Sequence, residues 1–166
     1  MKTLYTAYFT APAPFGVIRL EGHDEGITSI YFDQEGSALN AVESHPLLER
    51  CWEQLEAFFK GQRQAFDIPL AAEGTPFQQQ VWAALREIPF GETASYGAIA
   101  SALGKPTASR AVGMANGRNP LPIIVPCHRV IGANGQLTGY SGGLACKRWL
   151  LEHEQAHKDA HQAPLT

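Results

Sequence analysis

The sequence has few of the residues that stabilise small secreted or metal-binding proteins. Only three cysteines occur, Cys51, Cys127 and Cys146, and no two of them form a CxxC pair. Such an odd and widely spaced set argues against a disulfide framework and favours free thiols in a reducing compartment. No typical zinc-binding spacing of Cys and His is present, so we expect no metal site.

Long apolar runs are also missing. No stretch approaches the roughly 18 apolar residues of a membrane-spanning helix. The N-terminal segment, which begins Met1-Lys2-Thr3, contains no apolar run followed by a small-residue cleavage site. We therefore expect neither a membrane protein nor an exported one, and predict a cytoplasmic location.

The composition is that of a folded chain, but its charge is unevenly divided. Hydrophobic residues make up 45% and charged residues 17% of the 166 positions, which is enough apolar material for a core. Residues 1–74 contain five basic and eleven acidic side chains, whereas residues 75–153 contain seven basic and three acidic ones. This asymmetry indicates either an anionic partner for the second part or two ordinary domains of different isoelectric point.

The first part of the chain predicts strands followed by one helix. Strand-like segments separated by Pro- or Gly-containing turns occur at 4–10, 16–21 and 27–32. A helix is predicted from Pro46 to Phe59, because Pro46 suits the first helical position and Gly61 suits the end. Cys51 falls on the apolar face of this helix and is expected to be a buried core thiol.

The second part predicts several helices. Thr75, Pro76 and Gln78 have the pattern of a capping box with proline at the first helical turn. Two short helices then follow around the turn at 104–106, with Thr107 expected to cap the second of them. We predict domain limits of 1–72 and 73–157, followed by a polar tail at 158–166.

The two short helices have the outline of a helix-turn-helix motif. The second, at 108–116, has mostly small side chains, with Arg110 nearly alone among them. A helix that reads bases in the major groove normally carries Arg, Asn or Gln side chains. The composition therefore favours close approach to a DNA backbone or a narrow groove, and it also fits a helix that packs tightly on another helix.

The residues best suited to chemistry follow a β-branched run. Ile123-Ile124-Val125 leads into Pro126-Cys127-His128, and neighbours on an extended chain would point to opposite sides. A cysteine is a poor nucleophile until it is deprotonated, and a nearby histidine or cation lowers its pKa. His128 need not touch Cys127 directly and can act through a water molecule, and it needs an orienting partner.

A helix predicted from Leu144 to about His157 offers that partner. Lys147, Leu150 and Glu154 share one face of this helix, and a carboxylate in line with leucines is costly to bury unless it is paired. Glu154 is therefore the candidate that holds His128. The alternative is that Glu154 is simply exposed at the end of the helix.

Three blocks of residues together resemble a known family. They are Asn119-Pro120, Pro126-Cys127-His128-Arg129-Val130 and Gly139-Tyr140-Ser141-Gly142-Gly143. In sequence and order they resemble the O6-alkylguanine-DNA alkyltransferases, and the match extends from about Thr75 to Glu154. The resemblance implies an α+β fold, with a small N-terminal α/β domain of ribonuclease-H-like form. It implies a mostly helical second domain like a winged helix-turn-helix.

The resemblance also assigns roles to residues. The catalytic residues it implies are Cys127, His128, Glu154 and Tyr96, with Cys127 as the alkyl acceptor and Tyr96 as a donor to guanine N3. The DNA-binding residues it implies are Arg110, Ala108, Ser109 and Asn119, with Arg110 entering the base stack. The substrate pocket it implies contains Val130, Tyr140, Ser141, Met114 and Lys147, and the carbonyl groups of Cys127 and Val130 would hold the exocyclic amine.

The activity implied is repair of DNA by an irreversible, single-turnover transfer of the alkyl group, with flipping of the damaged base. The expected partner is double-stranded DNA containing O6-alkylguanine, bound by a monomer, and no cofactor or metal is needed. Activity on O4-alkylthymine is left open. Two rival hypotheses are a thiol hydrolase that uses Cys127, and a DNA-binding regulator in which this cysteine is incidental or redox-sensing.

Overall fold

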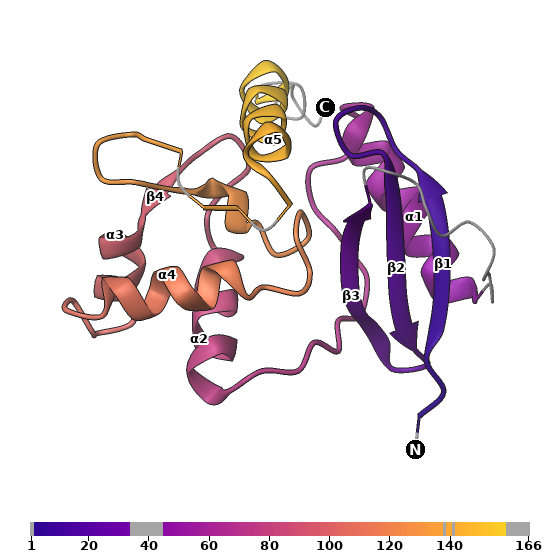
Figure 1. Cartoon of the computed structure of the whole chain (residues 1–166), viewed down its shortest axis with the longest axis horizontal. Coiled ribbons are helices and arrows are strands. Elements are labelled where there is room, and N and C mark those ends of the chain that lie inside the picture. Colours follow the sequence, from indigo (N-terminus) through magenta and orange to yellow (C-terminus); the bar gives the residue numbers. More distant parts are fainter. Residues whose placement is uncertain (1, 34–44, 138, 141, 159–166) are drawn as a thin grey trace, which may run out of the picture. The chain divides into compact units, whose positions relative to one another are not determined.

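The computed structural model describes residues 2–33, 45–137, 139–140 and 142–158. Its internal contacts divide the chain into two units, Met1–Glu73 and Gly74–Thr166 (Figure 1). The first contains a sheet and a long helix, and the second is mostly helical, so the chain has the expected α+β fold. The domain limits 1–72 and 73–157 stay a prediction, and most of the tail lies outside the described residues.

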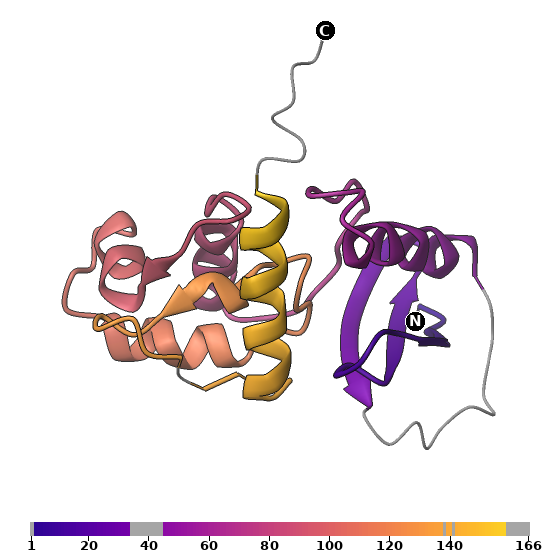
Figure 2. The ribbon, with the colours of Figure 1, turned by 90° about the horizontal axis from the view of Figure 1, so that it is seen from above.

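The N-terminal unit is an antiparallel sheet covered on one face by a helix (Figure 2). The strands are β1 (Tyr5–Thr10), β2 (Val17–His23) and β3 (Gly26–Asp33), in that order across the sheet. The predicted strand segments are confirmed to within a few residues at their ends. The pairing shifts between Glu21 and Gly22, where an added Cβ on Gly22 would lie 2.8 Å from the Gly26 carbonyl oxygen.

Helix α1 (Pro46–Phe59) has the bounds that its sequence predicts. The His45 side chain accepts a hydrogen bond from the Leu47 amide at the start of the helix, and Gly61 adopts φ 75° just beyond its end. The apolar face of the helix packs on the sheet. The largest side chains fully buried in this core are Phe15, Ile18, Leu20, Ile27, Leu48, Leu55 and Phe58.

The C-terminal unit contains four α-helices among its described residues. They are α2 (Pro76–Leu85), α3 (Tyr96–Ala102), α4 (Ser109–Gly117) and α5 (Leu144–His157). The predicted capping box of Thr75 and Gln78 is confirmed at the start of α2, and α5 has the predicted bounds. Short strands β4 (Ala94–Ser95) and β5 (Val130–Ile131) pair in parallel and join the start of α3 to the segment after Cys127.

The predicted cap of α4 is wrong. The N-cap residue is Ala108, without a side-chain hydrogen bond, and the helix begins at Ser109. The backbone itself closes the turn, because the Ala108 amide donates to the Lys105 carbonyl at 2.9 Å. Thr107 thus lies one residue too early to cap the helix.

Within the described ranges, no helix has both the length and the apolar character needed to cross a membrane.

Candidate active site

The chain segment that precedes Cys127 is buried and is held by hydrogen bonds of the Asn119 side chain. All ten residues from Leu121 to Val130 are buried. The Asn119 side chain accepts from the Leu121 amide at 3.0 Å and donates to the Val125 carbonyl at 2.8 Å. Ile123, between these two contacts, has φ 76°, which is rare for a β-branched residue. The bonds of Asn119 therefore stabilise a strained turn directly before the cysteine.

Cys127 lies on a tight turn and is only 3% exposed. The expectation of an extended chain is wrong here, because Cys127–Arg129 form a single 3₁₀ turn in which the Arg129 amide donates to the Pro126 carbonyl at 3.0 Å. The tight turn places two consecutive side chains, those of His128 and Arg129, on the same carboxylate.

That carboxylate belongs to Glu154 of α5. His128 Nε2 lies 2.6 Å from Glu154 Oε2, and the side chains are 0% and 1% exposed. A carboxylate accepts hydrogen bonds, so Nε2 carries the proton and Nδ1 of the neutral ring has a free lone pair. Among the described residues, Nδ1 has no hydrogen-bond partner although it is buried. His128 is thus fixed by Glu154 on one side and can accept a proton on the other.

Arg129 is the second cation on Glu154, and reasoning from the sequence did not single it out. Its Nε donates to Glu154 Oε1 at 2.8 Å and its Nη2 donates to Oε2 at 2.9 Å, a bidentate pair. Its Nη1 donates to the Ile88 carbonyl at 2.7 Å, and the Gly91 amide donates to Glu154 Oε1 at 3.1 Å. The unusual presence of an arginine inside the apolar 121–130 segment was the available signal.

These contacts determine the ionisation states of Glu154 and His128. Burial would raise the pKa of Glu154, but the hydrogen bonds and positive charges of His128 and Arg129 outweigh it and lower this pKa to about 2. Burial lowers the pKa of His128, and the interaction with Glu154 only partly opposes this effect. At neutral pH the cluster therefore contains an ionised Glu154 and a neutral imidazole.

The thiol of Cys127 is protonated in this arrangement. Burial raises its pKa to about 11, although hydrogen bonds with Asn119 and Tyr140 and the charge of Lys147 act in the opposite direction. The polar neighbours thus lower the pKa of the thiol in the expected direction, but desolvation of a thiolate costs more than they return, so the net pKa is raised.

Lys147 enters the same interior from α5. Its side chain is 0% exposed, and its Nζ donates to the Val130 carbonyl at 2.7 Å. Burial lowers the pKa of Lys147, and the nearby Cys127 opposes this effect. Tyr140 is also buried, and burial raises the pKa of its hydroxyl, with Cys127 as the next contributor. The structure thus brings Val130, Tyr140 and Lys147 together around Cys127.

The residues expected to contact DNA lie on the two short helices. Arg110 is exposed on α4, while Ala108 and Ser109 are half-buried at its start. Tyr96 begins α3 and is half-buried, with its ring against Gly113 of α4. The structure therefore places these residues on the surface and rim of the helical pair.

One expected pocket residue, Met114, does not join the group around Cys127. Met114 is 64% exposed on α4, so its contact with a bound nucleotide stays a prediction. Ser141 lies outside the described residues. Asn116, which was not predicted, is buried at 3% exposure instead, and its Nδ2 lies 3.4 Å from the Cys127 carbonyl oxygen. Its spacing from Val112 and Ala115 on the buried face of α4 could have revealed it.

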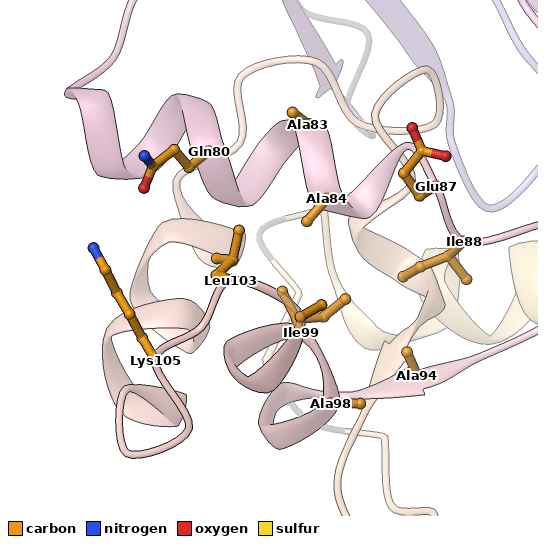
Figure 3. Close-up of a pocket in the computed structure, with 11 residues that line it drawn as sticks. Gln80, Ala83, Ala84, Glu87, Ile88, Ala94, Ala98, Ile99, Leu103 and Lys105 are labelled. Carbon is orange, nitrogen blue, oxygen red and sulfur yellow. The ribbon is translucent and has the colours of Figure 1, made fainter.

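A hollow of about 770 Å³ lies between α2 and α3 (Figure 3). Its floor is formed by small and aliphatic side chains such as Ala84 and Ile99, with Gln80, Glu87 and Lys105 around it. Neither Cys127 nor any residue of the His128–Glu154–Arg129 cluster lines it. The hollow shares Ile88 with the contacts of Arg129, but it does not include the thiol or the charged groups of the candidate active site.

The C-terminal unit thus combines two short helices, α3 and α4, with a buried cysteine and, next to it in the chain, a histidine paired with a carboxylate. Comparison with known proteins agrees. The family described as 6-O-methylguanine DNA methyltransferase, DNA binding domain, matches residues 76–156. The ribonuclease-like domain of the same family matches residues 4–72.

Individual relatives are similar over nearly their whole length. A methylated-DNA–protein-cysteine methyltransferase of Methanosarcina acetivorans is 50% identical over 155 residues, covering 91% of this chain and 98% of the relative. The crystal structure of an O6-methylguanine methyltransferase of Mycobacterium tuberculosis has a TM-score of 0.83 at 42% identity, covering 99% and 97% of the two chains. A structure of the M. tuberculosis protein in complex with DNA has a TM-score of 0.82 at 46% identity, covering 92% and 93%. The chain belongs to the 6-O-methylguanine DNA methyltransferase family.

Proposed function

We propose that this chain repairs alkylated DNA by transferring the alkyl group of O6-alkylguanine to its own Cys127, once and irreversibly. The observation that carries this proposal is the buried Cys127 on one turn with His128, whose imidazole is fixed by Glu154 at 2.6 Å. The helical pair with Arg110 lies in the same unit, and the M. acetivorans relative is named for the same transfer.

The reaction is a single displacement at the alkyl carbon. A bond forms between Cys127 Sγ and that carbon while the bond from the carbon to O6 breaks, and the electron pair stays on the guanine. Tyr96, at the start of α3, donates a hydrogen bond to guanine N3 and thereby stabilises the leaving base. A thioether is stable, so no further step restores Cys127, and the chemistry needs no cofactor.

The proton of Cys127 passes to His128. The resting thiol is protonated, since burial raises its pKa to about 11, and His128 Nδ1 is the available acceptor. A water molecule between the two completes the path. Glu154 stabilises the imidazolium that forms, and Arg129 supports this role because it keeps Glu154 ionised.

The lesion reaches Cys127 only when it leaves the base stack. The thiol is 3% exposed, and the O6 substituent is inaccessible inside a duplex. Flipping costs a few kcal/mol, and less for a poorly paired alkylated base, which contributes selectivity. Arg110 fills the place of the flipped base, and Ala108 and Ser109 let α4 lie close to the backbone. Tyr140, Ser141 and Lys147 line the pocket.

The protein acts as a monomer in the cytoplasm. Its three cysteines are free, which suits a reducing compartment, and the reacting groups described above all belong to one chain.

A titration of lesion against protein tests this function. We expect the amount of O6-methylguanine removed from a duplex to stop at one equivalent of active protein, however long the incubation continues. Continued turnover would favour a thiol hydrolase instead. Tight binding without loss of the lesion would favour a regulator, and either result would contradict the proposal.

A further inference from the structure

Among the described residues, one buried polar atom near Cys127 that the proposed mechanism does not use has no hydrogen-bond partner. Asn116 Oδ1 is buried and accepts no hydrogen bond from any described residue, while Nδ2 of the same amide makes a long contact of 3.4 Å to the Cys127 carbonyl. An unsatisfied buried acceptor costs about 1–3 kcal/mol, so its presence in a native fold needs an explanation.

The position of Asn116 is fixed from both sides. The indole of Trp82 in α2 donates to the carbonyl of the preceding residue, Ala115, at 2.9 Å. The main-chain amide of Asn119 donates to the main-chain carbonyl of Asn116 at 3.3 Å, where the chain turns toward the cysteine. The open acceptor is therefore held beside the main chain of Cys127 by the fold itself.

The chemistry of the lesion limits what such an acceptor can bind. When O6 of guanine is alkylated, the ring nitrogen N1 loses its hydrogen, and the exocyclic amine at C2 becomes the one N–H donor on the Watson–Crick edge. The O6 substituent and this amine lie on the same edge. A base whose alkyl carbon is at Cys127 Sγ thus presents its amine to the same wall of the pocket.

We propose that Asn116 Oδ1 accepts a hydrogen bond from the exocyclic amine of the flipped O6-alkylguanine, which makes Asn116 a specificity-determining residue. The amine has two hydrogens, and the Cys127 carbonyl beside Asn116 is the natural acceptor of the other. The second acceptor that the family resemblance implies, the Val130 carbonyl, already accepts from the Lys147 ammonium at 2.7 Å, so Asn116 Oδ1 takes its place in this proposal. This inference rests on the proposed function.

The same acceptor discriminates against bases without the amine. O4-alkylthymine has no N–H on its Watson–Crick edge, because alkylation removes the hydrogen of N3. A site built to hydrogen-bond one substrate rejects an analogue that leaves its polar group unpaired. Asn116 therefore favours alkylated guanine over alkylated thymine.

The test compares two lesions that differ by the amine alone. Single-stranded oligonucleotides carry O6-methylguanine or O6-methylhypoxanthine, so the cost of breaking a base pair does not enter. We expect the wild-type protein to react about tenfold faster with the guanine, the value of one well-placed hydrogen bond. In Asn116→Leu, which has nearly the same size and no acceptor, this preference falls several-fold, and the bond from the amine to the Cys127 carbonyl accounts for what remains.

Two further variants keep the test decisive. Val112→Ala changes the packing of the same buried face of α4 without touching a polar atom, and it should keep the wild-type preference. The serine side chain of Asn116→Ser is too short to place its oxygen where Asn116 Oδ1 lies, so this variant should show the same fall in preference. It provides the test if Asn116→Leu does not fold. Thermal unfolding and the rate of Cys127 with iodoacetamide confirm that each variant has an intact site.

The outcomes separate the two proposals. If Asn116→Leu and Asn116→Ser slow both lesions by the same factor, Asn116 only supports the fold, and its role in specificity is overturned. A wild-type protein that prefers neither base overturns that role as well. A wild-type protein that reacts neither with these oligonucleotides nor with a duplex containing O6-methylguanine overturns the proposed function itself.

Discussion

The two units of the chain fill their interiors with different chemistry. Among the described residues, the buried side chains of the N-terminal unit are hydrophobic, with packed aromatic rings such as Phe15 and Phe59 at 5.0 Å between centroids. Within the described part of the C-terminal unit, seven polar or charged residues are buried: Asn116, Asn119, His128, Arg129, Lys147, His153 and Glu154. Burying charge is costly unless each group is paired. The apolar core of the N-terminal unit thus stabilises the fold, whereas the polar core of the C-terminal unit costs stability and forms the candidate active site.

Two cysteines, one in each unit, show the same contrast between an apolar and a polar interior. Cys51 is 0% exposed in the N-terminal core, and burial alone raises its pKa to about 12. Cys127 is equally buried, but Asn119, Lys147 and Tyr140 partly offset the effect of burial on its pKa. Burial is common to both thiols, so the polar surroundings distinguish the reactive one.

Replacing each of these cysteines should give the largest difference. We expect Cys127→Ala to abolish alkyl transfer while its unfolding transition stays near that of the wild type. Cys51→Ala should lower stability through lost packing and leave transfer per folded molecule unchanged. Transfer assays with both variants, corrected for the folded fraction, make the comparison, and normal transfer by Cys127→Ala would exclude the mechanism.

Removing the charge of Glu154 should weaken the C-terminal unit strongly. Glu154→Gln leaves the buried Arg129 without its anion, which costs about 3–5 kcal/mol of unfolding free energy. It should also slow transfer, since His128 loses the group that stabilises its charged form. Denaturant unfolding and single-turnover transfer rates measure the two effects.

Leu55→Ala in the N-terminal core is the matched control for this change. It should cost about 2–5 kcal/mol through the cavity it leaves, with no change in the transfer rate of folded protein. If Glu154→Gln were as stable and as fast as the wild type, the buried cluster would have neither the structural nor the chemical role described.

Acid should destabilise the C-terminal unit through the same cluster. The pKa of Glu154 is 4.5 unfolded and about 2 folded, so its stabilising contribution is complete above pH 4.5 and is lost as the pH falls toward 2. The pKa of His128 is lowered on folding, so the unfolded chain binds its proton first below about pH 6.5, which acts in the same direction. Unfolding free energies measured from pH 7 to 2.5 should fall accordingly.

The pH dependence of the unfolding free energy in two variants shows whether Glu154 causes the acid sensitivity. Glu154→Gln should flatten the loss between pH 4.5 and 2.5, whereas Leu55→Ala should shift the whole curve down without changing its slope. An unchanged slope in Glu154→Gln would assign the acid sensitivity to other groups.

Arg110→Ala should have the smallest effect, because its side chain is exposed on α4. We expect repair of duplex DNA to slow roughly tenfold, because Arg110 offsets part of the few kcal/mol that base flipping costs. The reaction with the free modified base should keep its rate. Arg118→Ala removes an equal charge from the end of the same helix and should slow duplex repair less. Equal losses on duplex and free base in Arg110→Ala would argue against a role in flipping.

The sequence predicted what depends on local patterns. The bounds of α1 and α5 and the capping box of α2 follow from residues within one or two helical turns of each other. The pairing of Glu154 with His128 could be proposed because a carboxylate on an apolar helical face needs a partner.

The parts that were missed depend on contacts between distant segments. Arg129 binds Glu154 and the Ile88 carbonyl, which are 25 and 41 positions away, and no spacing rule relates them. Asn116 is notable only once α4 is packed beside the turn of Cys127. The raised pKa of Cys127 likewise reflects the depth of burial, which the chemical identity of its neighbours does not reveal.

The central claim is that Cys127 receives the alkyl group and keeps it. The most direct test is the intact mass of the protein after incubation with a duplex containing O6-methylguanine, followed by peptide mapping. We predict a gain of one methyl group per molecule, on the peptide that contains Cys127 and on neither of those with Cys51 and Cys146. An unchanged mass, or a methyl group on another residue, would contradict the account.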